Sequence, residues 1–178
     1  MTTIEKAAAA RESAATGVNA TAFDIGLLAL RAGFGGLLAV HGAQKLFGWF
    51  NGYGLTATQE SFEAMGYNPG ALFGTLAGLT ELVGGLLLLL GLATPLAAAI
   101  ALGTMVNALH ATWGDGLAVY ELALLFAIAI TTLAFTGPGR YSLDAGRPWQ
   151  RQGLVWGLGA VALALAAGVG TLILKWAL

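Results

Sequence analysis

The sequence predicts an all-α membrane protein, folded as a bundle of helices that crosses the bilayer five times. Mean hydropathy is +0.77. Charged residues make up 10% of the 178 residues, whereas soluble domains carry about a quarter. Five apolar stretches are each about as long as the roughly 20 residues that a spanning helix needs. Little of the chain is therefore left for a soluble domain.

Each apolar stretch is expected to form one spanning helix. The stretches cover residues 23–47, 71–92, 96–113, 117–136 and 154–174. Pro69, Pro95 and Pro138 fall at their boundaries, where a missing amide donor does least harm. The prolines therefore support these limits.

The connecting segments also carry structural signals. Residues 1–21 are small and polar, which predicts a flexible tail. Residues 48–70 form the longest connection and are rich in aromatic residues and glycine, which suit the bilayer interface. Within it, residues 56–65 are expected to form a short amphipathic helix on the membrane surface. Residues 22–152 are taken as a four-helix membrane domain, and residues 153–178 as an additional C-terminal spanning helix.

Lys and Arg in the connections predict the orientation, because positive charge is retained on the cytoplasmic side. Two segments carry these charges: the N-terminal tail has Lys6 and Arg11, and the connection after the fourth expected helix has Arg140, Arg147 and Arg151. An even number of predicted crossings separates these two segments, so both fall on the same side. The N-terminus is therefore expected in the cytoplasm and the C-terminus outside, in a plasma membrane.

Composition excludes several functions. A net charge of -1 lacks the basic footprint on which nucleic-acid binding depends. The chain has no cysteine, so it forms no disulfide, thiolate metal site or cysteine-held iron–sulfur cluster. Any redox chemistry must use a bound cofactor.

Small residues four apart predict which helix faces pack closely in lipid. The rows are Gly35, Ala39 and Ala43; Gly74 and Gly78; and Ala162, Ala166 and Gly170. Glu81 shares a helical face with Gly74, Gly78 and Gly85. Its side chain is therefore expected to point into the bundle.

Ionisable residues inside the spans are candidate functional groups, because each costs roughly 2.5–3.5 kcal/mol at mid-bilayer. Arg31 and Glu81 both fall near the middle of the membrane at 1.5 Å rise per residue. We predict a buried ion pair between them, serving either as a purely structural bridge or as a quinone or proton site. A second, outer polar cluster is expected from His41, Lys45, Asn107, His110 and Glu121.

The two histidines admit three interpretations: hydrogen bonding at helix ends, ligation of a haem or metal, or donation to a quinone carbonyl. Zinc normally requires three or four protein ligands, and only Asp115 or Glu121 can add to His41 and His110. No metal site is therefore predicted. A haem held by His41 and His110 remains the cofactor alternative to a quinone.

Three motifs resemble the DoxX family of small bacterial membrane proteins. They are LRAGFGGLLAVHGAQKLFG (30–48), ELVGGLLLLLGLATPLAA (81–98) and GPGRYSLDAGR (137–147). The resemblance covers the first four expected helices, and the fifth is an addition. The residues that it picks out are Arg31, His41, Gly42, Lys45, Glu81, Gly84, Gly85, Glu121, Arg140 and Asp144.

The resemblance implies a membrane component of an oxidoreductase system, since members are described as such. The leading hypothesis is a plasma-membrane subunit of a quinone-linked redox complex, contributing a buried polar site while a protein partner supplies electrons. No haem-attachment, nucleotide-binding or flavin motif is present, so the chain is not expected to catalyse alone. The first alternative is a non-catalytic anchor or assembly scaffold, using the fifth helix for a partner or a homo-oligomer. The second is a small transporter or channel.

Overall fold

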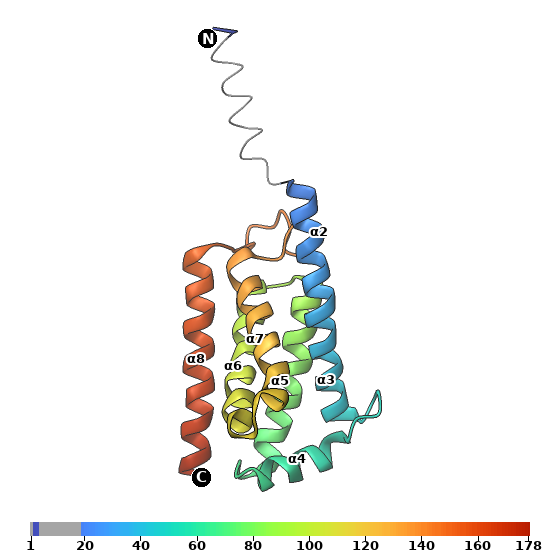
Figure 1. Ribbon diagram of the computed structural model, residues 1–178, viewed down its shortest axis with the longest axis vertical. Coiled ribbons are helices and arrows are strands. Elements are labelled where there is room, and N and C mark those ends of the chain that lie inside the picture. Colours follow the sequence, from blue (N-terminus) through green and yellow to red (C-terminus); the bar gives the residue numbers. More distant parts are fainter. Residues whose placement is uncertain (1, 4–18) are drawn as a thin grey trace.

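The computed structural model describes residues 2–3 and 19–178, and over this part the chain is helical with no strand (Figure 1). The elements are α2 (Ala20–Leu30), η1 (Arg31–Gly35), α3 (Gly36–Phe47), α4 (Gly54–Ala64), α5 (Gly70–Leu90), α6 (Thr94–Thr112), η2 (Trp113–Asp115), α7 (Leu117–Thr136) and α8 (Leu154–Ala177). The turn η1 is a single π-helical turn between α2 and α3.

Among the residues that the structure describes, five helical segments are long and apolar enough to cross a membrane. They are Ala20–Phe47, Gly70–Leu90, Thr94–Asp115, Leu117–Thr136 and Leu154–Ala177. The first joins α2, η1 and α3 without a break. These segments differ from the predicted helices by up to three residues at any end, so the predicted all-α membrane fold is confirmed.

Glycines and prolines set the helix ends. Gly48 and Gly91 end α3 and α5 with φ of +70° and +64°, a left-handed conformation that glycine adopts without a Cβ penalty. Pro69 immediately precedes α5, and Pro95 lies in the first turn of α6. The chain therefore reverses within a few residues at the α5–α6 connection.

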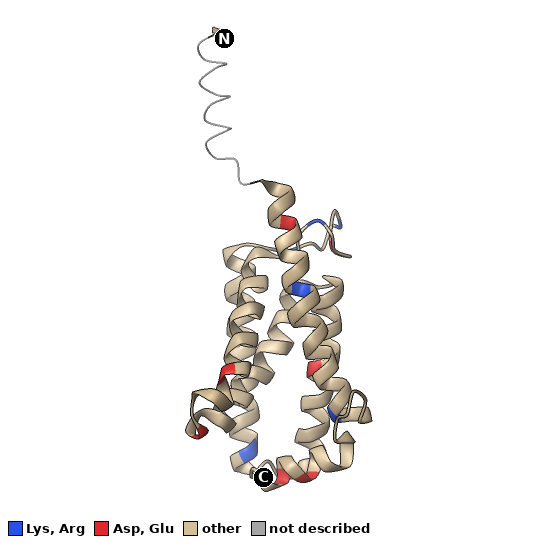
Figure 2. Cartoon of the chain, turned by 45° about the vertical axis from the view of Figure 1, so that its right-hand side comes forward, with Lys and Arg blue, Asp and Glu red and all other residues tan. Residues whose placement is uncertain are grey.

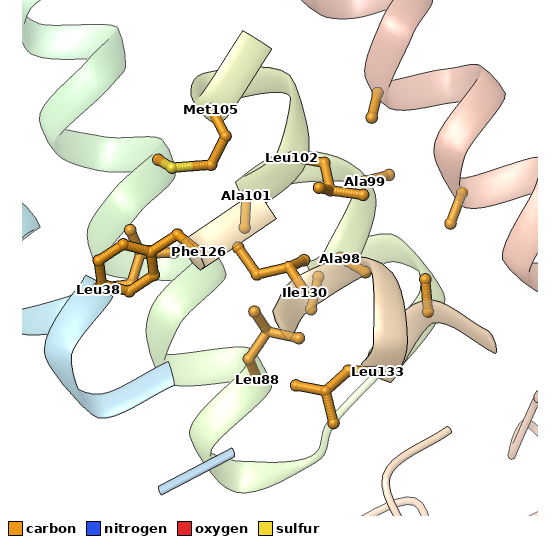
Figure 3. Packing of buried hydrophobic residues seen from close by; sticks show 14 of the residues in the cluster. Leu38, Leu88, Ala98, Ala99, Ala101, Leu102, Met105, Phe126, Ile130 and Leu133 are labelled. Carbon is orange, nitrogen blue, oxygen red and sulfur yellow. The ribbon is translucent and has the colours of Figure 1, made fainter. Parts of the chain in front are cut away.

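The core centres on α6, which packs against α5, α7 and α8. Ala97, Ala98 and Ala101 of α6 are fully buried, and their small side chains let the neighbouring helices approach closely. Larger side chains fill the space between helices, among them Leu88 of α5 and Ile130 of α7 (Figure 3). Many other large apolar side chains are exposed, as a bilayer environment requires.

The first span packs most closely on α5, through glycine. A Cβ built on Gly35 would lie 2.6 Å from the backbone nitrogen of Leu89. Gly42 and Gly85 likewise leave no room for a Cβ, against the backbones of Leu82 and Ala39. These contacts fix the register between α3 and α5.

The small-residue row predicted on the fifth helix is not the face that packs. Ala162, Ala166 and Gly170 are all exposed. The buried face of α8 consists instead of Gly157, Ala160, Ala164 and Gly168. Both rows repeat at about four residues, so spacing alone does not distinguish them.

The long connection between α3 and α5 contains α4, close to the predicted short helix at 56–65. It runs across one end of the bundle (Figure 1) and packs on α5 and α3. The buried Thr58 hydroxyl donates to the Lys45 carbonyl at 3.2 Å. Of the predicted tail, residues 1 and 4–18 lie outside the described residues, and α2 begins at Ala20.

Candidate functional site

Charged residues lie in two groups, one towards each end of the bundle, with an uncharged stretch between them (Figure 2). The group near the start of the first span includes Arg31 and the connection after α7. The group near the other end includes Lys45 and Glu81. These two groups have different roles.

Arg31 ties three segments together. Its side chain is 1% exposed. One terminal nitrogen donates to the Leu89 carbonyl at 2.8 Å, and the other donates to the Tyr141 carbonyl. A fixed guanidinium is suited to such paired donation. Arg31 therefore links the first span to the end of α5 and to the connection after α7.

Asp144 caps the start of α6. It is fully buried, and its carboxylate accepts from the Ala93 and Thr94 amides at 2.9 and 3.0 Å. It also accepts from the Thr94 hydroxyl at 3.0 Å and the Trp149 indole nitrogen at 3.1 Å. These bonds satisfy amide donors that a helix N-terminus leaves free.

Arg140 binds the first span from the same connection. Its amide donates to the Asp24 carboxylate at 3.0 Å, and its guanidinium lies 3.4 Å from the second carboxylate oxygen. The pKa of Arg140 is raised above its ordinary value, chiefly by the hydrogen bond that its guanidinium donates to the Tyr141 hydroxyl. Arg31, Arg140 and Asp144 form a cluster that is called the clasp below. The clasp holds helices together rather than forming a binding cavity.

The second group contains an ion pair inside the bundle. Lys45 Nζ lies 2.6 Å from Glu81 Oε2, with side chains 29% and 8% exposed respectively. Glu81 lies on the glycine-rich face of α5 that contacts α3. A Cβ on Gly78 would lie 3.4 Å from Lys45 Cβ. The close approach of the two helices therefore brings the pair together.

The structure corrects the predicted pairing of Arg31 with Glu81. Glu81 pairs with Lys45, whereas Arg31 donates to the backbone carbonyl of Leu89, eight residues further along α5, and to that of Tyr141. Helical side chains lean towards the N-terminus of their own helix. Because α3 and α5 are antiparallel, Lys45 and Glu81 lean towards each other, whereas Arg31 and Glu81 lean apart. The predicted pairing used the depth of each backbone position in the membrane and left out the lean of the side chains.

The ion pair faces a cavity of about 210 Å³ between α3, α5 and α6. Its polar lining consists of Lys45, Glu81, Tyr67, Thr104, Asn107 and Thr112. Lys45 also lines a larger cavity of about 720 Å³ beneath α4, together with His41 and Gln44. Lys45 thus lines both cavities, whereas Glu81 lines only the smaller one.

Tyr67 is a member of this site that the sequence analysis treated only as an interfacial aromatic. It is 2% exposed, and its hydroxyl donates to Asn107 Oδ1 at 3.3 Å. Lys175 Nζ lies 4.1 Å from the centre of its ring. Burial raises the pKa of the Tyr67 hydroxyl above 10.0. Nothing in the local sequence distinguishes it from the other aromatic residues of this connection.

The predicted outer cluster is only partly assembled. Lys45 and Asn107 line the cavity beside Glu81, and His41 lines the adjoining one, its ring packed on Phe126. His110 is exposed and packs on Trp176, and Glu121 is exposed on α7. Among the described residues no three His, Asp or Glu side chains gather closely enough to hold a metal ion.

This arrangement offers complementary chemistry in one cavity. Lys45 is a donor, Glu81 is a carboxylate acceptor, and the Tyr67 and Thr104 hydroxyls serve in either role. The remaining walls are apolar, including Phe62 and Ala77. Such a lining can both donate to and accept from the polar groups of a small molecule.

The sequence model of the DoxX family matches residues 26–113. The chain belongs to the DoxX family. The match contains Arg31, Lys45 and Glu81, and it contains every residue that lines the cavity at the ion pair. The fourth and fifth spans of this DoxX protein, and its GPGRYSLDAGR segment, lie outside the matched residues. No curated protein and no solved structure matches the chain.

Proposed function

We propose that this DoxX protein is a membrane subunit of a quinone-linked redox complex, and that the cavity at Lys45 and Glu81 holds the quinone headgroup. One observation carries the proposal: an ion pair faces a cavity inside a membrane-spanning bundle. Ionisable groups are costly there, and commonly serve ligands or protons. The site lies inside the family match, as expected if its function belongs to the family.

The residues suit the two ends of a quinone ring. Lys45 donates to one carbonyl oxygen, and the Tyr67 hydroxyl donates to the other. Reduction of the ring to the hydroquinone takes up two electrons, supplied by a partner oxidoreductase, and two protons. The Lys45 ammonium gives each proton to the reduced ring and regains it from water in the larger cavity, which Lys45 also lines with His41 and Gln44, while the Glu81 carboxylate holds the ammonium in place. That cavity is the proposed aqueous route.

The proposal includes a location and a division of labour. The protein lies in a bacterial plasma membrane with its N-terminus in the cytoplasm, supported by the three arginines of the connection after α7. Residues 22–152 form the DoxX-like domain, and residues 153–178 add a further spanning helix, α8. The electron donor is a separate protein partner.

The test is headgroup binding by the full chain in lipid nanodiscs. The probe is a benzoquinone ring without a tail, titrated by equilibrium dialysis. Wild type is expected to bind it, and Glu81→Gln to weaken binding at least tenfold. Glu121→Gln is the matched control, because Glu121 is a carboxylate on a spanning helix outside the cavity. Equal binding by all three proteins, or no binding to wild type, would refute the proposal.

A membrane anchor for a partner enzyme is the second candidate. The exposed row of Ala162, Ala166 and Gly170 on α8 favours it, because small residues permit close helix packing in lipid. In that case Ala166→Leu would release the partner from purified complexes while quinone binding persisted. Retention of the partner would count against the anchor.

A further inference from the structure

An apolar groove lies beside the Glu81 cavity, with a volume of about 210 Å³. Residues of α6 form its floor, and residues of α5 and α8 form its walls. Leu76 on one wall is 42% exposed and Ala167 on the other is exposed. Because α5 and α8 are spanning helices, the groove opens towards the acyl chains of the bilayer.

The groove and the Glu81 cavity adjoin each other. Both are lined by Phe62, Tyr67, Ala77, Thr104 and Asn107. The polar members of this set lie at the junction, and the far part of the groove is lined by apolar side chains such as Leu76 and Ile100. The combined space therefore changes from charged to apolar with distance from the ion pair.

Small side chains keep the groove open. Ala77, Ala99, Gly103 and Ala167 line it, and a Cβ on Gly103 would meet nothing closer than 3.4 Å. Asn107 holds the wall in place, because its side-chain amide donates to the Gly168 carbonyl of α8 at 3.1 Å. Water finds few hydrogen-bond partners in an apolar groove, whereas a hydrocarbon chain can fill the groove without losing hydrogen bonds.

We propose that this groove binds the apolar tail of the molecule whose headgroup occupies the Glu81 cavity. The inference rests on the proposed function and specifies the ligand further. It is a long-chain, lipid-soluble quinone that enters sideways from the bilayer between α5 and α8. The helix α8, which lies outside the family match, supplies one wall and so contributes to tail recognition.

The experiment maps head and tail separately by photolabelling of the full chain in nanodiscs. Two probes are used, both benzoquinones with a ten-carbon tail, carrying a diazirine either on the ring or at the tail end. The ring probe is expected to label peptides around Lys45 and Glu81. The tail probe is expected to label residues 99–104 and 167–171, and excess unlabelled decylquinone removes both signals.

Two variants on exposed positions of α8 provide the comparison. Ala167→Phe fills the groove and is expected to abolish tail labelling at residues 99–104 while ring labelling persists. Gly159→Phe adds a phenyl ring outside the groove, where a Cβ meets nothing within 4 Å, and is expected to leave both patterns unchanged.

Either part can fail visibly. Tail labels spread over the lipid-facing surface, unaffected by Ala167→Phe, with ring labelling intact, would overturn the groove and leave the proposed function standing. Tail labels in the groove without ring labels near Glu81 would overturn the headgroup site, and with it the inference that one molecule occupies both spaces.

Discussion

At the scale of single residues, the Lys45–Glu81 pair is the most consequential contact in the protein. Glu81 is largely removed from water and Lys45 partly so, with side chains 8% and 29% exposed, and each charge is stabilised by the other. A buried pair adds little compared with two apolar residues, yet breaking it leaves one charge unpaired. Its retention at a cavity wall therefore points to a use beyond stability.

The side chains of Lys45 and Glu81 are therefore expected to be strongly coupled in their effect on stability. Glu81→Gln lowers the free energy of unfolding by about 3 kcal/mol, the lower end for a broken buried pair because Lys45 is 29% exposed. Adding Lys45→Met restores most of that loss, since no unpaired charge remains. Reversible unfolding in mixed micelles, arranged as a double-mutant cycle, measures the coupling. Additive effects would contradict the structure.

Burial of Tyr67 predicts a distinct pH dependence. Its pKa is raised above 10.0 by burial, so the folded state favours the neutral phenol. Stability from this residue is therefore fully present below pH 10.0 and is lost as the pH rises through the folded pKa. The absorbance change at about 295 nm, wild type minus Tyr67→Phe, is expected to titrate above pH 10.0. A difference that titrates at or below pH 10.0 would mean that Tyr67 is accessible to water.

At the scale of elements, glycine contacts between α3 and α5 position the site. Gly42 and Gly85 bring the two backbones together, and the ion pair forms at this contact. Separating the helices would widen the gap between Lys45 and Glu81. Packing and chemistry thus depend on the same residues.

Adding a methyl group at this contact is therefore expected to be costly. Gly42→Ala forces the α3 and α5 backbones apart and lowers the free energy of unfolding by about 2 kcal/mol, as overpacking does. Gly36→Ala on the same helix meets nothing within 4 Å, and is neutral or slightly stabilising. Thermal unfolding of both variants checks the difference; equal melting temperatures would contradict the register.

The helices were largely predictable from the sequence, whereas their contacts were not. Apolar length and boundary prolines are local properties, so the five spans agree with the structure to within three residues. The partner of Glu81 depends on side-chain lean and on the register of α3 against α5. The buried face of α8 depends on its neighbours, since both Ala160–Ala164 and Ala162–Ala166 have the same spacing. The role of Asp144 as a helix cap required the spatial meeting of distant segments.

At the scale of the whole molecule, five spans place the two ends of the bundle on opposite sides of a membrane. The connection between α7 and α8, which contains Arg140 and Asp144, lies near one end, and α4 lies across the other (Figure 1). The larger cavity that Lys45 lines is beneath α4. Under the proposed function, orientation therefore decides which compartment would exchange protons with the site.

The absence of natural cysteine makes that orientation simple to measure. Single cysteines at Tyr53 and Pro148, both exposed, report the two ends of the bundle. A membrane-impermeant maleimide is expected to label Tyr53→Cys in intact cells, and Pro148→Cys only after permeabilisation. The reverse pattern would place α4 in the cytoplasm and redirect the proton route.

The measurement that tests the central claim most directly is the quinone content of the purified protein. Lipid extracts of wild type and Glu121→Gln are expected to contain stoichiometric quinone. The paired variant Lys45→Met with Glu81→Gln, which removes both charges without leaving either unpaired, is expected to contain none while remaining folded. Equal quinone in all three proteins, or its absence from wild type, would contradict a headgroup site at Lys45 and Glu81.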